Sequence, residues 1–194
     1  TFMIDETFKT KFTFRHAGLS PIEYNRSNAL EEQLSHFYLS LKYFGLKNEK
    51  KPKSWLEAFY LLVRLLDEKR DGERQVVFID ELPWLDTKRS GFITALEGFW
   101  NTWGCHRDDL MLIVCGSATS WMMNELIGNH GGLYGRITYE IKLVPFTLNE
   151  CELYLKEKNI AYSRYDTVQS YMMLGGIPYY MEYLMQGNSL PLDI

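Results

Sequence analysis

Short, continuously apolar runs alternate along the chain with longer stretches in which apolar residues recur every three or four positions. The runs 76–79 and 110–115 are apolar at every position, which is typical of strands buried on both faces of a parallel sheet. Between them, apolar residues recur at helical spacing at 92, 96, 99, 100 and 103. A strand, a helix and a second strand at this separation predict a right-handed parallel unit.

Other segments of the first 145 residues complete this core. Residues 11–17 alternate between apolar and polar side chains, which predicts a strand nearer the sheet edge, taken as the second strand of the fold. Helices with one apolar face are expected over 34–44 and 54–66, the second opened by the capping-box pair Ser54 and Glu57. The alternating segment 137–143 predicts the last core strand.

The remaining residues have a helical pattern. Thr147 and Glu150 form a second capping-box signature, and helices are expected over 165–174 and 178–185. The glycine pair Gly175 and Gly176 permits a sharp turn between them. The predicted organisation is therefore a core over residues 1–145 and a small helical lid over residues 146–194.

Polar residues follow both apolar runs at the point where each predicted strand ends. Asp80 and Glu81 come directly after the first run, and Ser117 comes just after the second. In open α/β sheets, ligands bind beyond the carboxyl ends of the strands. These side chains therefore suit a metal, a water molecule and a hydrogen-bonding sensor for phosphate. Two alternatives stay open: the acids only solvate the strand exit or cap the next helix, and Ser117 caps the helix near Trp121.

Composition narrows the class of protein. The chain has 194 residues, 46% of them hydrophobic, and a net charge of −4, which allows one sizeable core plus an appendage. Cys105, Cys115 and Cys151 lack the spacing of a disulfide framework or a zinc site. No apolar run approaches the roughly 20 residues needed to cross a bilayer, so we expect a cytoplasmic protein without a membrane segment. The lysine-rich segment 47–53 is interpreted as a solvated loop rather than a nucleic-acid patch.

The order and spacing of four segments resemble the bacterial and archaeal AAA-type P-loop ATPases, a poorly characterised group often found beside a nuclease-like C-terminal domain. The segments are VVFIDELPWL, LMLIVCGSATSWM, GGLYGRITYEIKLVPFTLNE and LGGIPYYMEYL, and the resemblance covers nearly the whole chain. It implies an α/β fold with a P-loop NTPase-like parallel sheet flanked by helices and a small C-terminal helical lid. It also implies ATP and Mg²⁺ as ligands and ATP hydrolysis as the activity.

One part of the P-loop pattern is not in the chain. The phosphate-binding motif G-x-x-x-x-G-K-[ST] is absent, and the glycine-rich stretch Gly128–Arg136 has an arginine where a lysine and a hydroxyl residue are required. That stretch is interpreted as a flexible loop. Because relatives carry G-K-T followed by an apolar helix at this place, we expect Thr1 to be the last residue of the motif and a magnesium ligand. The alternative is that the sequence starts at an incidental boundary.

The resemblance implies a role for each remaining candidate. Asp80 would position Mg²⁺ through water, and Glu81 would orient or deprotonate the attacking water. Ser117 would sense the γ-phosphate. Arg136 would stabilise developing charge, within its own subunit or a neighbouring one. The alternative for Arg136 is a surface salt bridge.

The biological setting is only coarsely implied. We expect an ATPase that couples its nucleotide state to an attached effector domain or a protein partner. The alternative is a nucleotide-dependent switch or a scaffold with little or no turnover. Contact with nucleic acid is expected only through a domain outside this sequence, and the sequence leaves the oligomeric state open.

Overall fold

Three parallel strands form the sheet: β1 (Phe12–Ala17), β2 (Gln75–Asp80) and β3 (Leu110–Val114), in the order β1-β2-β3. The structure is a computed structural model that describes residues 2–9, 11–20, 28–128 and 131–185. Residues 1–138, which contain the sheet, and residues 139–194 form two compact units. The predicted strands are confirmed at these three places, with the 11–17 strand at one edge and the 76–79 strand in the middle of the described sheet.

The central strand is buried on both of its faces. Val77 and Ile79 belong to the main hydrophobic core on one face. On the other face, the Phe78 ring stacks on Phe12 at 5.9 Å between centroids, and the Arg15 guanidinium lies 5.7 Å from each of these two rings. Alternate side chains of a strand point to opposite faces, so a strand covered on both sides needs apolar residues at every position. This explains the continuous run in the sequence.

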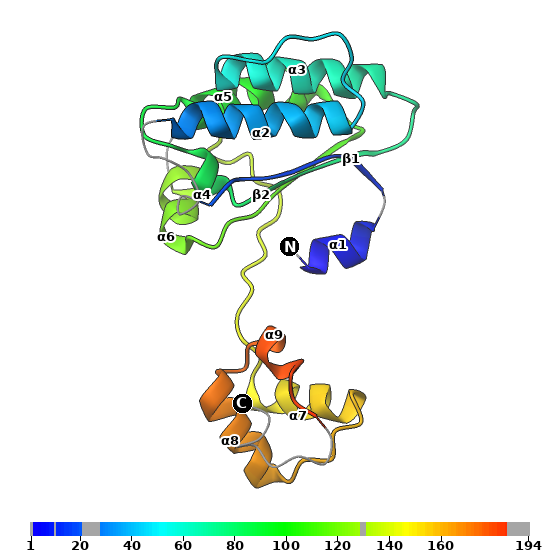
Figure 1. Ribbon diagram of the computed structural model, residues 1–194, viewed down its shortest axis with the longest axis vertical. Helices are drawn as coiled ribbons and strands as arrows, with labels where there is room; N and C mark the ends of the chain where they lie inside the picture. The colour runs from blue at the N-terminus through cyan, green and yellow to red at the C-terminus, as the bar shows by residue number, and fades with distance from the viewer. Residues whose placement is uncertain (1, 10, 21–27, 129–130, 186–194) are drawn as a thin grey trace. The chain divides into compact units, whose positions relative to one another are not determined.

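Three helices lie together on one face of the sheet: α2 (Ala29–Tyr43), α3 (Trp55–Glu68) and α5 (Phe92–Thr102) (Figure 1). Their contacts are rich in aromatic rings, with centroids 5.4 Å apart for Phe37 and Trp55 and 5.0 Å apart for Trp55 and Phe92. The helix α3 begins where its cap predicts, because the Ser54 hydroxyl accepts a hydrogen bond from the Glu57 amide.

The helix α1 (Phe2–Phe8) lies on the other face of the sheet (Figure 1). Asp5 of α1 forms an ion pair with Arg15 of β1 at 2.9 Å. The Phe8 ring lies 5.9 Å from the Phe12 ring. Among the described residues, no helix is both long enough and apolar enough to span a membrane.

The second unit has its own small core. It contains α7 (Leu148–Glu157), α8 (Arg164–Leu174) and α9 (Pro178–Met181). The capping box predicted at Thr147 and Glu150 is present. Gly176 has a φ of +68°, and its carbonyl accepts a hydrogen bond from the Phe146 amide at 2.8 Å. A side chain at this glycine would place its Cβ 2.3 Å from the Phe146 oxygen, so only glycine fits the turn.

The strand predicted over 137–143 is wrong, because none of these residues has strand structure. Their apolar side chains are exposed, from 44% for Ile137 to 81% for Tyr139. A strand needs backbone partners along its length, and none of the described strands pairs with this segment. Arg136 therefore precedes a segment without regular secondary structure.

Candidate functional site

Asp80 and Glu81 lie at the carboxyl end of the central strand, where the sequence pattern places a ligand site. Asp80 is the last residue of β2 and is 4% exposed. One of its carboxylate oxygens, Oδ1, accepts a hydrogen bond from the Glu81 amide at 3.0 Å. Asp80 is thus held inside the rim of the sheet.

The Glu81 backbone turns away from the strand in the left-handed conformation, with φ of 50° and ψ of 50°. This turn starts the short helix α4 (Leu82–Leu85) and directs the Glu81 side chain toward β3. Its Oε2 accepts hydrogen bonds from the Ser117 amide at 3.2 Å and from the Ser117 hydroxyl at 2.9 Å. Within the described part of the chain, no hydrogen bond reaches Oε1. The structure therefore brings Glu81 and Ser117 together and leaves one carboxylate oxygen for another ligand.

Neither residue caps a helix with its side chain. Glu81 occupies the position before α4 but makes no side-chain capping bond there. The residue before α6 (Thr119–Trp121) is Ala118 rather than Ser117. The alternatives in which Glu81 or Ser117 caps the following helix with its side chain are therefore wrong.

Two glycines let the neighbouring strand ends approach the acids closely. Gly18 follows β1, and its amide donates to the Asp80 carbonyl at 3.1 Å. A Cβ at Gly18 would lie 2.9 Å from the Glu81 carbonyl oxygen. A Cβ at Gly116, after β3, would lie 2.7 Å from Cδ of Pro83. Both positions therefore need a residue without a side chain.

Cys115 is a neighbour of Asp80. Its place in the apolar run 110–115 predicts a small hydrophobic residue of the core. Burial raises the pKa of the Cys115 thiol, and the negative charge of Asp80 and a hydrogen bond to it raise this pKa further. The thiol is therefore protonated near neutral pH and is directed at the Asp80 carboxylate. The only sequence signal was its position as the last residue of the second apolar run.

Gln33 is a positioning residue that sequence reasoning missed. Its side chain is fully buried, and its Nε2 donates to the carbonyls of Leu19 and Trp84, both at 2.9 Å. Its Oε1 accepts from the Leu19 amide at 3.0 Å. These bonds tie α2 to the segment after β1 and to α4, so Gln33 fixes the backbone on both sides of the acids.

Arg136 and Thr1 are not brought to this site by any described contact. Arg136 is exposed, and its guanidinium forms no ion pair with a carboxylate in the described ranges. The surface salt bridge considered for Arg136 is therefore not among the described contacts. Thr1 lies outside the described residues.

Asp80 and Glu81 are the residues at this site that could contribute to binding a metal ion together with a ligand. The described residues contain no group of three or more His, Cys, Asp and Glu side chains placed to hold a metal ion. Mg²⁺ keeps several waters and is typically bound by one or two carboxylates together with substrate phosphates. A buried Asp80 carboxylate, followed in the chain by a Glu81 carboxylate that Ser117 holds, fits that kind of site.

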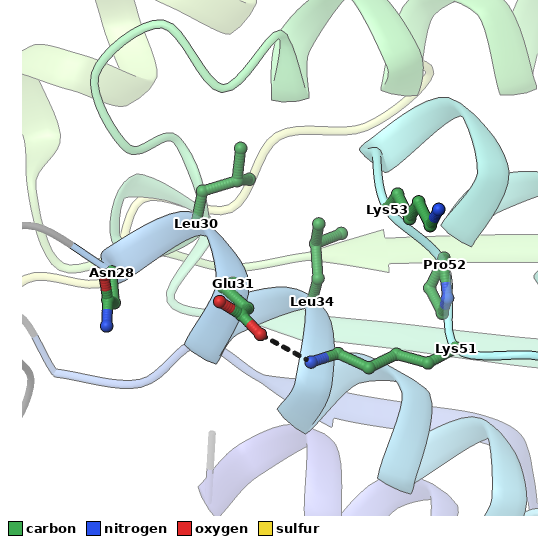
Figure 2. A pocket seen from close by; sticks show the side chains of 7 residues that line it. All are labelled: Asn28, Leu30, Glu31, Leu34, Lys51, Pro52 and Lys53. Carbon is green, nitrogen blue, oxygen red and sulfur yellow. Dashed lines mark hydrogen bonds and ion pairs between the residues drawn. The ribbon is translucent and has the colours of Figure 1, made fainter.

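A separate hollow of about 540 Å³ lies between the start of α2 and the loop before α3 (Figure 2). Leu34 and Pro52 are among the residues that line it, and an ion pair of 3.3 Å joins two other lining residues, Glu31 and Lys51. None of the predicted site residues lines this hollow. It is therefore not the site that the sequence predicts.

The fold resembles that of a known ATPase. A solved structure of a Walker-type ATPase from Pyrococcus abyssi matches 93% of this chain with a TM-score of 0.57 and 20% sequence identity. The chain spans 57% of the length of that protein. No protein-family model and no curated protein matches the chain. At this identity the likeness shows the fold alone, an α/β arrangement with a parallel sheet flanked by helices.

Proposed function

We propose that this chain binds and hydrolyses ATP as part of an AAA-type P-loop ATPase. The observation that carries the proposal is the pair Asp80 and Glu81 at the end of the central strand, with the Glu81 carboxylate hydrogen-bonded to Ser117. The likeness in fold to a Walker-type ATPase supports it. The AAA type, the lid over residues 146–194, the cytoplasmic location and the coupling to an effector domain or partner rest on the sequence patterns alone.

The acids have separate roles in the proposed reaction. Asp80 would hold Mg²⁺ through water, and the ion would neutralise charge on the β- and γ-phosphates. Glu81 would orient the attacking water or take its proton through Oε1, the oxygen left free by Ser117. Positioning by two hydrogen bonds fixes the plane of the Glu81 carboxylate, so the acceptor is oriented before ATP arrives.

Ser117 would connect phosphate sensing to this base. Its hydroxyl has one proton, which it donates to Glu81 in the described structure. A γ-phosphate oxygen within reach of the same hydroxyl would compete for that proton. We therefore infer that ATP binding changes the hydrogen bonding of Glu81 as well as that of Ser117.

Thr1 and Arg136 complete the proposed site. Thr1 would be the hydroxyl ligand of Mg²⁺ at the end of the phosphate-binding motif. The full-length sequence tests this directly, because a Gly-Lys pair must come immediately before Thr1. Any other dipeptide there contradicts the role of Thr1. Arg136 would neutralise charge on the transferring phosphoryl group.

A Glu81→Gln substitution tests the proposed function. Glutamine keeps the shape of the side chain but cannot take a proton, so we expect kcat to fall by about 10²–10⁴-fold. The Kd for ATP, measured by calorimetry with the full-length protein and Mg²⁺, should change little. Glu73→Gln is the matched control, because Glu73 is an exposed acid in the turn before β2. Wild-type turnover by Glu81→Gln would refute the role of Glu81, and no ATP binding by the wild type would refute the function.

A further inference from the structure

The residues that precede Arg136 are fastened to α5 by both backbone groups of one glycine. The Gly132 amide donates to Oε1 of Glu97 at 2.8 Å. The Gly132 carbonyl accepts from Nδ2 of Asn101 at 2.9 Å. Both bonds are partly buried, and they join positions 35 and 31 residues apart in the chain. We call this set of contacts the Gly132 clamp.

The clamp depends on the four-residue spacing of Glu97 and Asn101 and on the absence of a side chain at Gly132. Glu97 and Asn101 are four positions apart on α5, so their side chains lie on the same face of the helix. A Cβ at Gly132 would lie 2.8 Å from Nδ2 of Asn101 and 3.2 Å from Cδ of Glu97. The two side chains therefore grip the backbone so closely that any other residue at 132 would displace one of them.

The helix that carries the clamp is itself rigidly held. Phe92, Leu96 and Phe99 of α5 are at most 4% exposed and belong to the main core. Near the start of α5, Asp86 accepts a hydrogen bond from Nε1 of Trp121 at 3.2 Å. Asp86 follows α4, the helix that begins after Glu81. The helix α5, which holds Gly132, is thus anchored in the main core, and Asp86 at the end of α4 is linked to Trp121 of α6.

The chain between the clamp and Arg136 is short and ordered. The Tyr134 amide donates to the Gly131 carbonyl at 3.2 Å, and the Arg136 amide donates to the Leu133 carbonyl at 3.0 Å. Leu133 packs against the main core. The backbone of Arg136 is therefore fixed by these turns and by the clamp, while its side chain is exposed.

We propose that Glu97 and Asn101 are positioning residues that hold the Gly132 loop so that Arg136 is presented to the phosphate chain of ATP. This inference rests on the proposed function, because it gives Arg136 a role in hydrolysis. Neither Glu97 nor Asn101 contacts the nucleotide in this proposal. They act only through the backbone of Gly132.

Gly132→Ala and Asn101→Asp break the clamp from opposite sides. Alanine inserts a Cβ between the two side chains, and aspartate replaces the donor to the Gly132 carbonyl by an acceptor. In the full-length protein, each should lower kcat by about 10–100-fold, the scale expected for a catalytic group misplaced by about 1 Å. ATP affinity should change little. The Gly132 amide should lose its protection from hydrogen exchange.

Matched variants separate positioning from general damage. Gly98→Ala makes the same chemical change in α5 at a position where no atom lies within 4 Å of the new Cβ, and it should leave kcat unchanged. Glu97→Gln keeps an acceptor oxygen for the Gly132 amide and should retain most of the activity that Glu97→Leu loses. Arg136→Ala combined with Gly132→Ala should be no slower than Arg136→Ala alone, because the clamp acts through Arg136.

The outcomes are distinguishable. If the wild type does not hydrolyse ATP, the proposed function fails and the role of Arg136 fails with it. If the wild type hydrolyses ATP and Gly132→Ala loses amide protection without losing turnover, only the clamp inference is overturned. Additive losses in the Arg136 and Gly132 double variant would also overturn it.

Discussion

Glu81 has a backbone conformation that a glutamate adopts only at a cost. Its φ of 50° lies in the left-handed region, where a Cβ costs an L-residue roughly 1–2 kcal/mol. Glycine has no such cost at the same position. Strained residues of this kind concentrate at functional sites. The left-handed glutamate at the end of the central strand is therefore consistent with a use for Glu81 beyond folding, although Lys9, Asn48, Arg89 and Asn159 also have positive φ.

A comparison of Glu81→Gly with Glu81→Ala measures that strain. Both variants lose the hydrogen bonds to Ser117, so their difference reports the backbone conformation alone. We expect Glu81→Gly to be more stable than Glu81→Ala by about 1 kcal/mol in urea unfolding. At Glu152, inside α7, the order should reverse, because glycine is about 1 kcal/mol worse than alanine in a helix. Equal stability of the two Glu81 variants would mean that the left-handed turn is absent.

At the scale of elements, the sequence predicted what depends on local pattern. The central strand and the crossover helix were predicted because each segment has a recognisable apolar pattern of its own. Val77 and Ile79 in the strand, and Phe92 and Phe99 in the helix, are the core residues that make up these patterns. The 137–143 strand failed because alternation describes two faces of a segment and does not provide the neighbouring strand that its backbone needs.

The unpredicted parts of the site depend on contacts between distant segments. Gln33 reaches Trp84 across 51 positions, and Gly132 reaches Glu97 across 35. No local spacing marks such residues. The acids were predictable because they directly follow an apolar run in the sequence. The hydrogen bond between Glu81 and Ser117 was not, because Ser117 follows a different strand, 36 positions away.

The packing of α2 on β1 makes the protein sensitive to acid through His16. This ring is 2% exposed, its Nδ1 lies 2.9 Å from the Ser40 hydroxyl, and its centroid is 4.8 Å from that of His36. Burial lowers the pKa of His16 to about 3, and the charge of His36 lowers it as well. Burial also lowers the pKa of His36.

The sign of the effect follows from proton uptake. Between pH 6.5 and about 3 the unfolded chain binds a proton at His16 that the folded chain does not, so stability falls as the pH is lowered through this range. The slope from one such group approaches about 1.4 kcal/mol per pH unit. Urea unfolding at several pH values should give a shallower slope for His16→Gln, while His106→Gln, at an exposed ring, should keep the wild-type slope. Identical slopes for wild type and His16→Gln would contradict the buried neutral ring.

At the scale of the whole molecule, the two units have separate hydrophobic cores. The core of residues 1–138 contains Leu62 with no exposed surface, and the core of residues 139–194 contains Leu155 at 2% exposure. Each core is made of buried residues from its own unit only. A substitution in one core should therefore act on the unfolding of that unit.

Leu62→Ala and Leu155→Ala form a matched pair for this test, because the same atoms are removed from two fully packed sites. Each change should cost about 2–5 kcal/mol, from lost burial and from the cavity left behind. In calorimetry we expect Leu62→Ala to lower the transition of the first unit and Leu155→Ala to lower that of the second. Hydrogen exchange resolved by segment assigns each transition, since only the affected unit should lose protection. A single transition that shifts as a whole in both variants would show that the two units unfold together and would contradict their independence in unfolding.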